Sequence, residues 1–157
     1  MFSEQPSPFN PSAITEAALS AIRLIETEYY TSCHAFTFPS QLDFVFQDTI
    51  VSISVPAALL DCEVTLNDSP VYPATRNLGY TKNNAPLHLY ADTLGRLLVA
   101  LDRVEMGRLD EVCNVRRSLI QKINNEGKLL EQRVSGVWDT RNNTMIGFEQ
   151  VLTLFCS

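Results

Sequence analysis

The chain has 157 residues, a formal net charge of −6 and a hydrophobic fraction of 45%, which together predict one core-forming domain with appendages. Charged residues make up 19%, too few for a chain that charge keeps disordered. The acidic balance argues against a nucleic-acid binder, because such proteins neutralise phosphates with Lys and Arg. No apolar run reaches the roughly 20 residues that span a bilayer, so we expect no membrane insertion.

The first predicted elements are a flexible N-terminus and a helix. Residues 1–9 are rich in Pro and Ser and lack the basic and apolar parts of a secretory signal. A helix is expected from Pro11, after the capping residue Asn10, to about His34 or Phe36. Its apolar residues recur at three- and four-residue steps: Ile14, Ala18, Ala21, Ile22, Ile25, Tyr29 and Cys33.

Residues 40–80 predict a long connection that carries short extended pieces. Val51, Ile53 and Val55 alternate with serines, as in a strand, but prolines and turn-forming residues follow them. We therefore expect an insertion over about 45–80. Either it is a tolerated surface loop or it has a function of its own.

Two further helices are predicted, one from the cap Asn84 to about Met106 and one from Asp110 to about Val134. The apolar stripe of the first is Leu87, Tyr90, Leu94, Leu97, Leu98 and Leu101. The stripe of the second is Val112, Val115, Leu119, Ile123, Leu130 and Val134. The short connection makes these two helices antiparallel neighbours.

The three helices predict an all-α fold: an antiparallel three-helix bundle with a long irregular insertion between helices one and two. This bundle would occupy residues 10–134. Residues 135–157 are a C-terminal tail of unknown structure, because Gly136 and Asn142-Asn143 interrupt the helical pattern.

Catalytic and metal-binding patterns are weak. The cysteines are widely scattered and predict reduced thiols in a cytoplasmic or nuclear compartment: Cys33, Cys62, Cys113 and Cys156. His34 and His88 are the only histidines, so no metal site and no cofactor are expected. No catalytic motif is present, which predicts a non-enzymatic protein. A thiol enzyme using Cys33 or Cys113 is the alternative.

The flanks of the second and third helices carry opposite charges. Three- and four-residue steps place Asp92, Gly95, Val99 and Asp102 on one ridge. The third helix places Cys113, Arg117, Ile120, Asn124 and Lys128 on a flank, with Arg116 at the edge of its core stripe. Two interpretations stay open: a solvated surface with intramolecular ion pairs, or a protein interface, which the apolar Val99 and Ile120 favour.

Three segments of the chain resemble a BAG domain. They are Tyr80-Thr-Lys-Asn-Asn-Ala-Pro-Leu-His-Leu-Tyr90, Leu97-Leu-Val-Ala-Leu-Asp-Arg-Val-Glu105 and Val112-Cys-Asn-Val-Arg-Arg-Ser-Leu-Ile-Gln-Lys-Ile123. The most specific elements are Leu101-Asp102 and Arg116-Arg117 at this separation. The upstream Phe36-Thr-Phe-Pro-Ser-Gln-Leu-Asp-Phe44 resembles the version of the domain found in fungi. The resemblance spans about residues 10–134, apart from the insertion.

The resemblance implies a co-chaperone function. BAG domains bind the nucleotide-binding domain of 70-kilodalton heat-shock chaperones (Hsp70) and promote release of ADP. The partner-binding positions it implies are Asp92, Asp102, Arg116, Arg117 and Asn124, and the ridge analysis adds Val99 and Ile120. We therefore expect a monomeric cytoplasmic nucleotide exchange factor. The alternative is a helical adaptor that lacks exchange activity.

Overall fold

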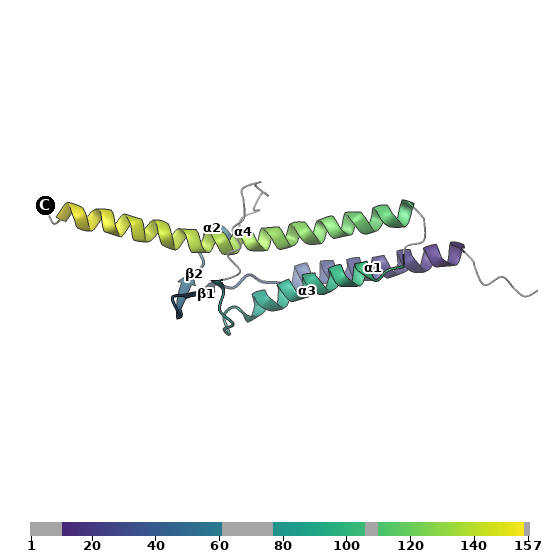
Figure 1. Ribbon diagram of the computed structural model, residues 1–157, viewed down its shortest axis with the longest axis horizontal. Helices are drawn as coiled ribbons and strands as arrows, with labels where there is room; N and C mark the ends of the chain where they lie inside the picture. Colours follow the sequence, from purple (N-terminus) through teal and green to yellow (C-terminus); the bar gives the residue numbers. More distant parts are fainter. Residues whose placement is uncertain (1–10, 61–76, 106–109, 156–157) are drawn as a thin grey trace, which may run out of the picture. The chain divides into compact units, whose positions relative to one another are not determined.

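The computed structural model describes the backbone of residues 11–60, 77–105 and 110–155, and side chains no further than Arg141. The predicted flexible segment 1–9 lies outside these residues, as do Cys62 and Cys156. The described elements are α1 (Pro11–Ala35), β1 (Gln41–Phe46), β2 (Thr49–Ser54), α2 (Ala57–Leu60), α3 (Ala85–Asp102) and α4 (Asp110–Phe155) (Figure 1).

The prediction of an all-α three-helix bundle is wrong. Most of the described residues are helical, but β1 and β2 form a two-stranded antiparallel sheet in the connection 40–80, where only short extended pieces were expected. The physical reason lies in β1: Leu42 and Phe44 are buried on one face of the strand, and on the other face Asp43 is buried between the exposed Gln41 and Val45. A second apolar strand with the same period then pairs with this one.

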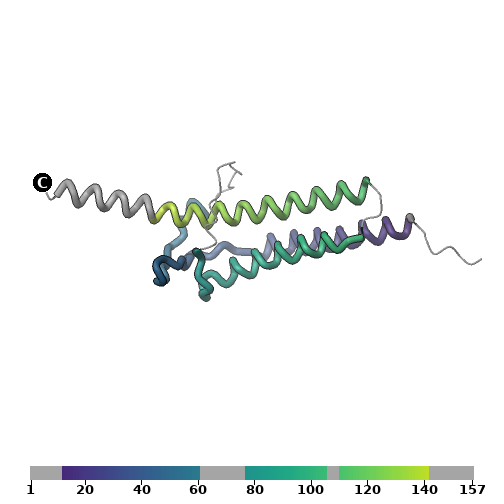
Figure 2. The backbone as a smooth tube through the Cα atoms, in the orientation of Figure 1, coloured from purple at the N-terminus to yellow at the C-terminus, as the bar shows by residue number. Residues whose placement is uncertain are grey.

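The turn of the hairpin has a conformation that its residues do not favour. Phe46 pairs with Thr49, so Gln47 and Asp48 form a two-residue loop. The hairpin is the dark blue part of the tube in Figure 2. Both have positive φ angles, 48° and 59°, as a type I′ turn requires. Asn-Gly is the usual sequence for this turn, so Gln-Asp gave no hairpin signal.

Replacing Asp48 by Gly is expected to raise the free energy of unfolding by roughly 0.5–1 kcal/mol. Glycine adopts the positive φ of position 48 without steric cost, whereas an L side chain is strained there. Urea denaturation of the two proteins measures the difference. A destabilised D48G variant would show that the Asp48 side chain contributes more than its backbone strain costs.

The expected start and end of the first helix are confirmed, whereas the third helix is longer than predicted. α4 continues through the predicted tail as far as Phe155. Gly136 costs a helix interior roughly 1 kcal/mol relative to Ala, but Val134 and Val137 on either side of it are fully buried. Their packing outweighs the weak helix propensity of the glycine.

The chain divides into two compact units, and α3 and α4 contribute to both. The first unit joins Met1–Ala35 with Thr93–Ile123, and the second joins Phe36–Asp92 with Asn124–Ser157. The core of the first is formed by one face of each helix: Ala18, Ile22, Tyr29, Leu94, Leu97, Leu101, Val112, Leu119 and Ile123. In this unit α3 runs opposite to α4 (Figure 1).

The second unit is organised around the buried side chain of Asn84. Its Oδ1 accepts a hydrogen bond from the Asp43 backbone N–H at 3.0 Å, and its Nδ2 donates to the carbonyls of Asp43 and Gly79 at 2.6 and 2.8 Å. Its own carbonyl accepts the bonds of Leu87 and His88 that open α3. Asn84 therefore begins the helix, as predicted, but its side chain joins the helix to the hairpin instead of capping it.

The carboxylate of Asp43 is also buried and fully hydrogen-bonded. The Ser52 hydroxyl donates to its Oδ1 at 2.6 Å, and the Asn83 amide donates at 3.1 and 3.3 Å. Hydrogen bonds from Ser52, and then from Thr81, hold the pKa of Asp43 below its ordinary value despite burial. The charge thus stays on a buried strand position, where hydroxyl and amide groups donate hydrogen bonds to it.

Candidate partner-binding surface

The first ridge of the candidate surface lies on the last turns of α3. Val99 and Asp102 are three residues apart, so their side chains lie on the same face of the helix. Both are exposed, and the side chain of Asp102 is 85% exposed. This ridge borders the buried Leu97 and Leu101, so the same two turns supply a core face and a solvent face.

The second ridge lies on the first turns of α4 and contains Arg116 and Ile120. Arg116 occupies a position of the buried seam, four residues after Val112 and three before Leu119, and its side chain is only 15% exposed. Its aliphatic stem therefore packs along apolar surface while the guanidinium reaches the edge. Val115, predicted to be in the core, is 38% exposed, because Arg116 takes the seam position instead.

An ion pair joins the two ridges. Arg116 Nη2 donates to Asp102 Oδ1 at 2.8 Å. Because Asp102 is so exposed, the pair adds only about 0–1 kcal/mol to the free energy of unfolding. Its main effect is on position: the guanidinium is held beside a carboxylate that solvent, or a partner, still reaches. We call Val99, Asp102, Arg116, Arg117 and Ile120 the α3–α4 surface.

The other members of the α3–α4 surface are accessible to different degrees. Arg117 is exposed and Ile120 is half-buried. The surface thus combines a carboxylate, two guanidinium groups and two aliphatic side chains within the first unit. Protein interfaces commonly combine aliphatic and charged side chains in this way.

The remaining predicted positions belong to the second unit. Asp92 is the last residue of the α3 part of that unit, and Asn124 is the first residue of the α4 part. Both are exposed on their helices. The structure therefore brings Asp102 and Arg116 into contact, with Val99 and Ile120 three and four residues from them on the same helices, while Asp92 and Asn124 fall in the second unit.

A second polar cluster in the first unit joins α4 to α1. Lys122 Nζ donates to Glu26 Oε1 at 3.0 Å and to the Tyr30 hydroxyl at 2.9 Å. These two bonds raise the pKa of Lys122 above its ordinary value, and the bond to the Tyr30 hydroxyl has the larger effect. Lys122 therefore links α4 to two residues of α1.

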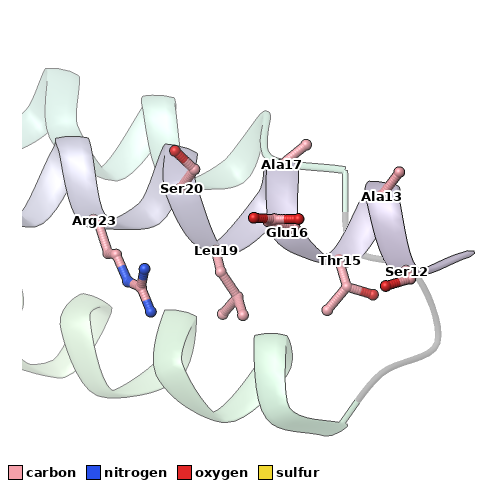
Figure 3. Close-up of a pocket in the computed structure, with 8 residues that line it drawn as sticks. All are labelled: Ser12, Ala13, Thr15, Glu16, Ala17, Leu19, Ser20 and Arg23. Carbon is pink, nitrogen blue, oxygen red and sulfur yellow. The ribbon is translucent and has the colours of Figure 1, made fainter.

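The hollows of the first unit are open and chemically mixed. One of about 700 Å³ is lined by α1 alone, and Figure 3 shows Thr15, Leu19 and Arg23 pointing to the same side of that helix. Another of about 530 Å³ lies between α1 and the end of α3 and is lined mainly by alanines and aliphatic side chains. Neither gathers the convergent polar groups of a small-molecule site.

The described residues contain neither a metal-binding group of side chains nor a helix that could span a membrane. Among them, no three His, Cys, Asp or Glu side chains form a group that could hold a metal ion. Cys33 and Cys113 are half-buried and neither forms a disulfide. Within the described ranges, none of the helices is both long enough and apolar enough to cross a bilayer.

Sequence reasoning missed an aromatic cluster in the second unit. Trp138 of α4 packs against Phe44 and Phe46 of β1, with ring centroids 4.9 and 6.1 Å apart. The Arg141 guanidinium lies over the rings of Phe46 and Trp138 at 5.7 and 5.2 Å. The alternation of Leu42, Phe44 and Phe46 was the signal that could have placed a strand against this tryptophan.

Comparison of the chain with protein-family models, with curated proteins and with solved structures finds no match in any of the three. The functional interpretation therefore rests on the residues of the α3–α4 surface and on the sequence resemblance.

Proposed function

We propose that this protein is a co-chaperone that binds the nucleotide-binding domain of Hsp70 and promotes release of ADP. The observation that supports it most is the ion pair of Asp102 with Arg116 at 2.8 Å on neighbouring helices. These are the two most specific positions of the resemblance to BAG domains. The proposal depends on these residues and not on an all-α fold.

The chemistry of the α3–α4 surface suits such a partner. The exposed Asp102 and Arg117 offer one charge of each sign, which fixes the orientation of a partner and speeds its encounter more than it adds affinity. Val99 and Ile120 supply the apolar contact that a charged rim needs at its centre. Asp92 and Asn124 are further contacts that the resemblance implies.

Exchange would follow from a difference in affinity. A protein that binds the open form of a nucleotide-binding domain more tightly than the closed form shifts the population toward the open form. ADP leaves the open form faster. No catalytic group is needed for this activity, which would take place in the cytoplasm or the nucleus.

The test is release of fluorescent ADP from a purified Hsp70 nucleotide-binding domain, with and without the full chain at micromolar concentration. Faster release supports the proposal. Unchanged release contradicts it. A pull-down that finds another partner and no bound Hsp70 favours the alternative, a helical adaptor.

A substitution that removes the charge of Asp102 is expected to reduce the acceleration of ADP release about tenfold, as the loss of one interfacial charge pair would. Asp102→Asn keeps the size of the side chain, and because Asp102 is exposed the fold should tolerate it. Glu28→Gln is the matched control, since Glu28 is exposed on α1 outside the surface. Equal activity of the two variants would remove Asp102 from the binding site.

A further inference from the structure

The hydrogen-bonding directions of the hairpin are fixed by the contacts of Asp43. Its N–H donates to Asn84, and its carbonyl accepts from Asn84 and from the N–H of Gly79. Both groups thus point away from β2, so Asp43 and its cross-strand neighbour Ser52 are a non-hydrogen-bonded pair. Alternation along the strand then directs the N–H and C=O groups of Ile50, Ser52 and Ser54 to the outer edge of β2.

The outer edges of β1 and β2 differ in their hydrogen bonding. Asn84 and Gly79 occupy the outer edge of β1, and Leu78 forms a bridge with Phe44. At the outer edge of β2, by contrast, no backbone group bonds to any of the residues that the structure describes. An edge of this kind is a template for another strand.

The sequence of β2 carries none of the usual protection of an edge strand. Thr49–Ser54 reads Thr-Ile-Val-Ser-Ile-Ser and has no charge, no proline and no glycine. Natural edge strands commonly use lysine, proline or a bulge to prevent pairing. Four of these six residues are β-branched aliphatic residues or threonine, which favour extended structure.

We propose that β2 pairs edge to edge with β2 of a second copy of this chain, in an antiparallel, twofold-symmetric arrangement. With the twofold axis at Ser52, that residue exchanges both backbone hydrogen bonds with Ser52 of the second copy. Ile50 likewise exchanges both with Ser54 of the second copy, and Ser54 with Ile50. Every outward group described above then has a partner.

The side chains agree with this register. Directly opposed residues of an antiparallel pair lie on the same face, so Val51 comes opposite Ile53 of the second copy, on the face that carries the buried Phe44. On the other face, the 58% exposed Ile50 comes opposite a serine. Because β2 has no charged side chain, the two paired strands bring no like charges together. The twofold register is also self-complementary, which favours a second copy of this chain over a charged peptide.

Sedimentation of the full chain over a concentration series tests the proposal. A monomer–dimer equilibrium is expected, and Ile50→Lys should weaken it about tenfold or more by adding a charge at the edge. Ser54→Pro should weaken it as well, because it removes an outward N–H and leaves the bonds to β1 intact. Val45→Lys is the matched control: Val45 is 41% exposed, lies opposite Ile50 and adds the same charge on the β1 side.

Amide hydrogen exchange adds a readout at single residues. With rising protein concentration the amides of Ile50, Ser52 and Ser54 should gain protection, whereas those of Val51 and Ile53, already bonded to β1, should not change. The proposal is overturned if the chain stays monomeric at several hundred micromolar. It is equally overturned if Ile50→Lys and Val45→Lys weaken association alike, or if protection appears elsewhere.

Discussion

Replacement of Asn84 by Ala is expected to lower the free energy of unfolding by about 4 kcal/mol. The amide of Asn84 is fully buried and makes three hydrogen bonds to backbone groups of Asp43 and Gly79. Alanine leaves the buried Asp43 N–H without its partner, which costs about 1–3 kcal/mol. It also removes one hydrogen bond from each of the two carbonyls, at about 1 kcal/mol each, while Gly79 N–H still bonds to Asp43 and His88 still contacts the Gly79 carbonyl. The loss is a large part of the roughly 5–15 kcal/mol that stabilises a typical domain.

The chain offers a matched control next to this residue. Asn83 is exposed and donates only to the Asp43 carboxylate, which Ser52 also satisfies. Asn83→Ala should therefore cost about 1 kcal/mol or less. Asn84→Asp separates size from hydrogen bonding: it keeps the shape, loses both donated bonds and should be nearly as unstable as the alanine variant.

Urea denaturation followed by the fluorescence of Trp138, the only tryptophan, measures all three variants. This residue packs on Phe44 of β1, so its emission reports on the hairpin directly. Equal midpoints for the Asn83 and Asn84 variants would mean that the amide of Asn84 does not hold the hairpin to α3.

The helices were the predictable part of this fold, because their signals are local. Pro11 at the start of α1, Asp110 at the start of α4 and the three- and four-residue apolar spacing all lie within single segments. The hairpin depends on non-local facts instead. Its turn residues, Gln47 and Asp48, are not the Asn-Gly or Asp-Gly pair that signals a two-residue hairpin. The backbone N–H of the buried Asp43 finds its partner in Asn84, 41 residues later.

The candidate surface shows the same division. The helical period placed Val99 with Asp102 and Arg116 near Ile120, and the structure adds that Asp102 and Arg116 are in contact. The exposure of Val115 and the seam position of Arg116 could not be predicted, because the period alone does not say which of two adjacent residues a neighbouring helix covers. Hydrophobicity favoured Val115, whereas the long stem of Arg116 fills the seam.

Replacement of Phe44 by Ala is expected to lower the free energy of unfolding by about 3–5 kcal/mol, because it leaves a cavity beneath the hairpin. Phe44 has no exposed surface and its ring packs against Trp138 at 4.9 Å.

Phe46 provides the comparison, since it lies on the same face of β1 and near the same tryptophan, at 6.1 Å, but is 46% exposed. Phe46→Ala loses mainly its contacts with Trp138 and with the guanidinium of Arg141, which are worth about 1 kcal/mol at an exposed site. Chemical denaturation monitored by circular dichroism avoids any direct effect of either ring on tryptophan emission. If both variants lose a similar free energy of unfolding, Phe44 is not more deeply buried than Phe46. Phe44 would then not be part of the core of the second unit.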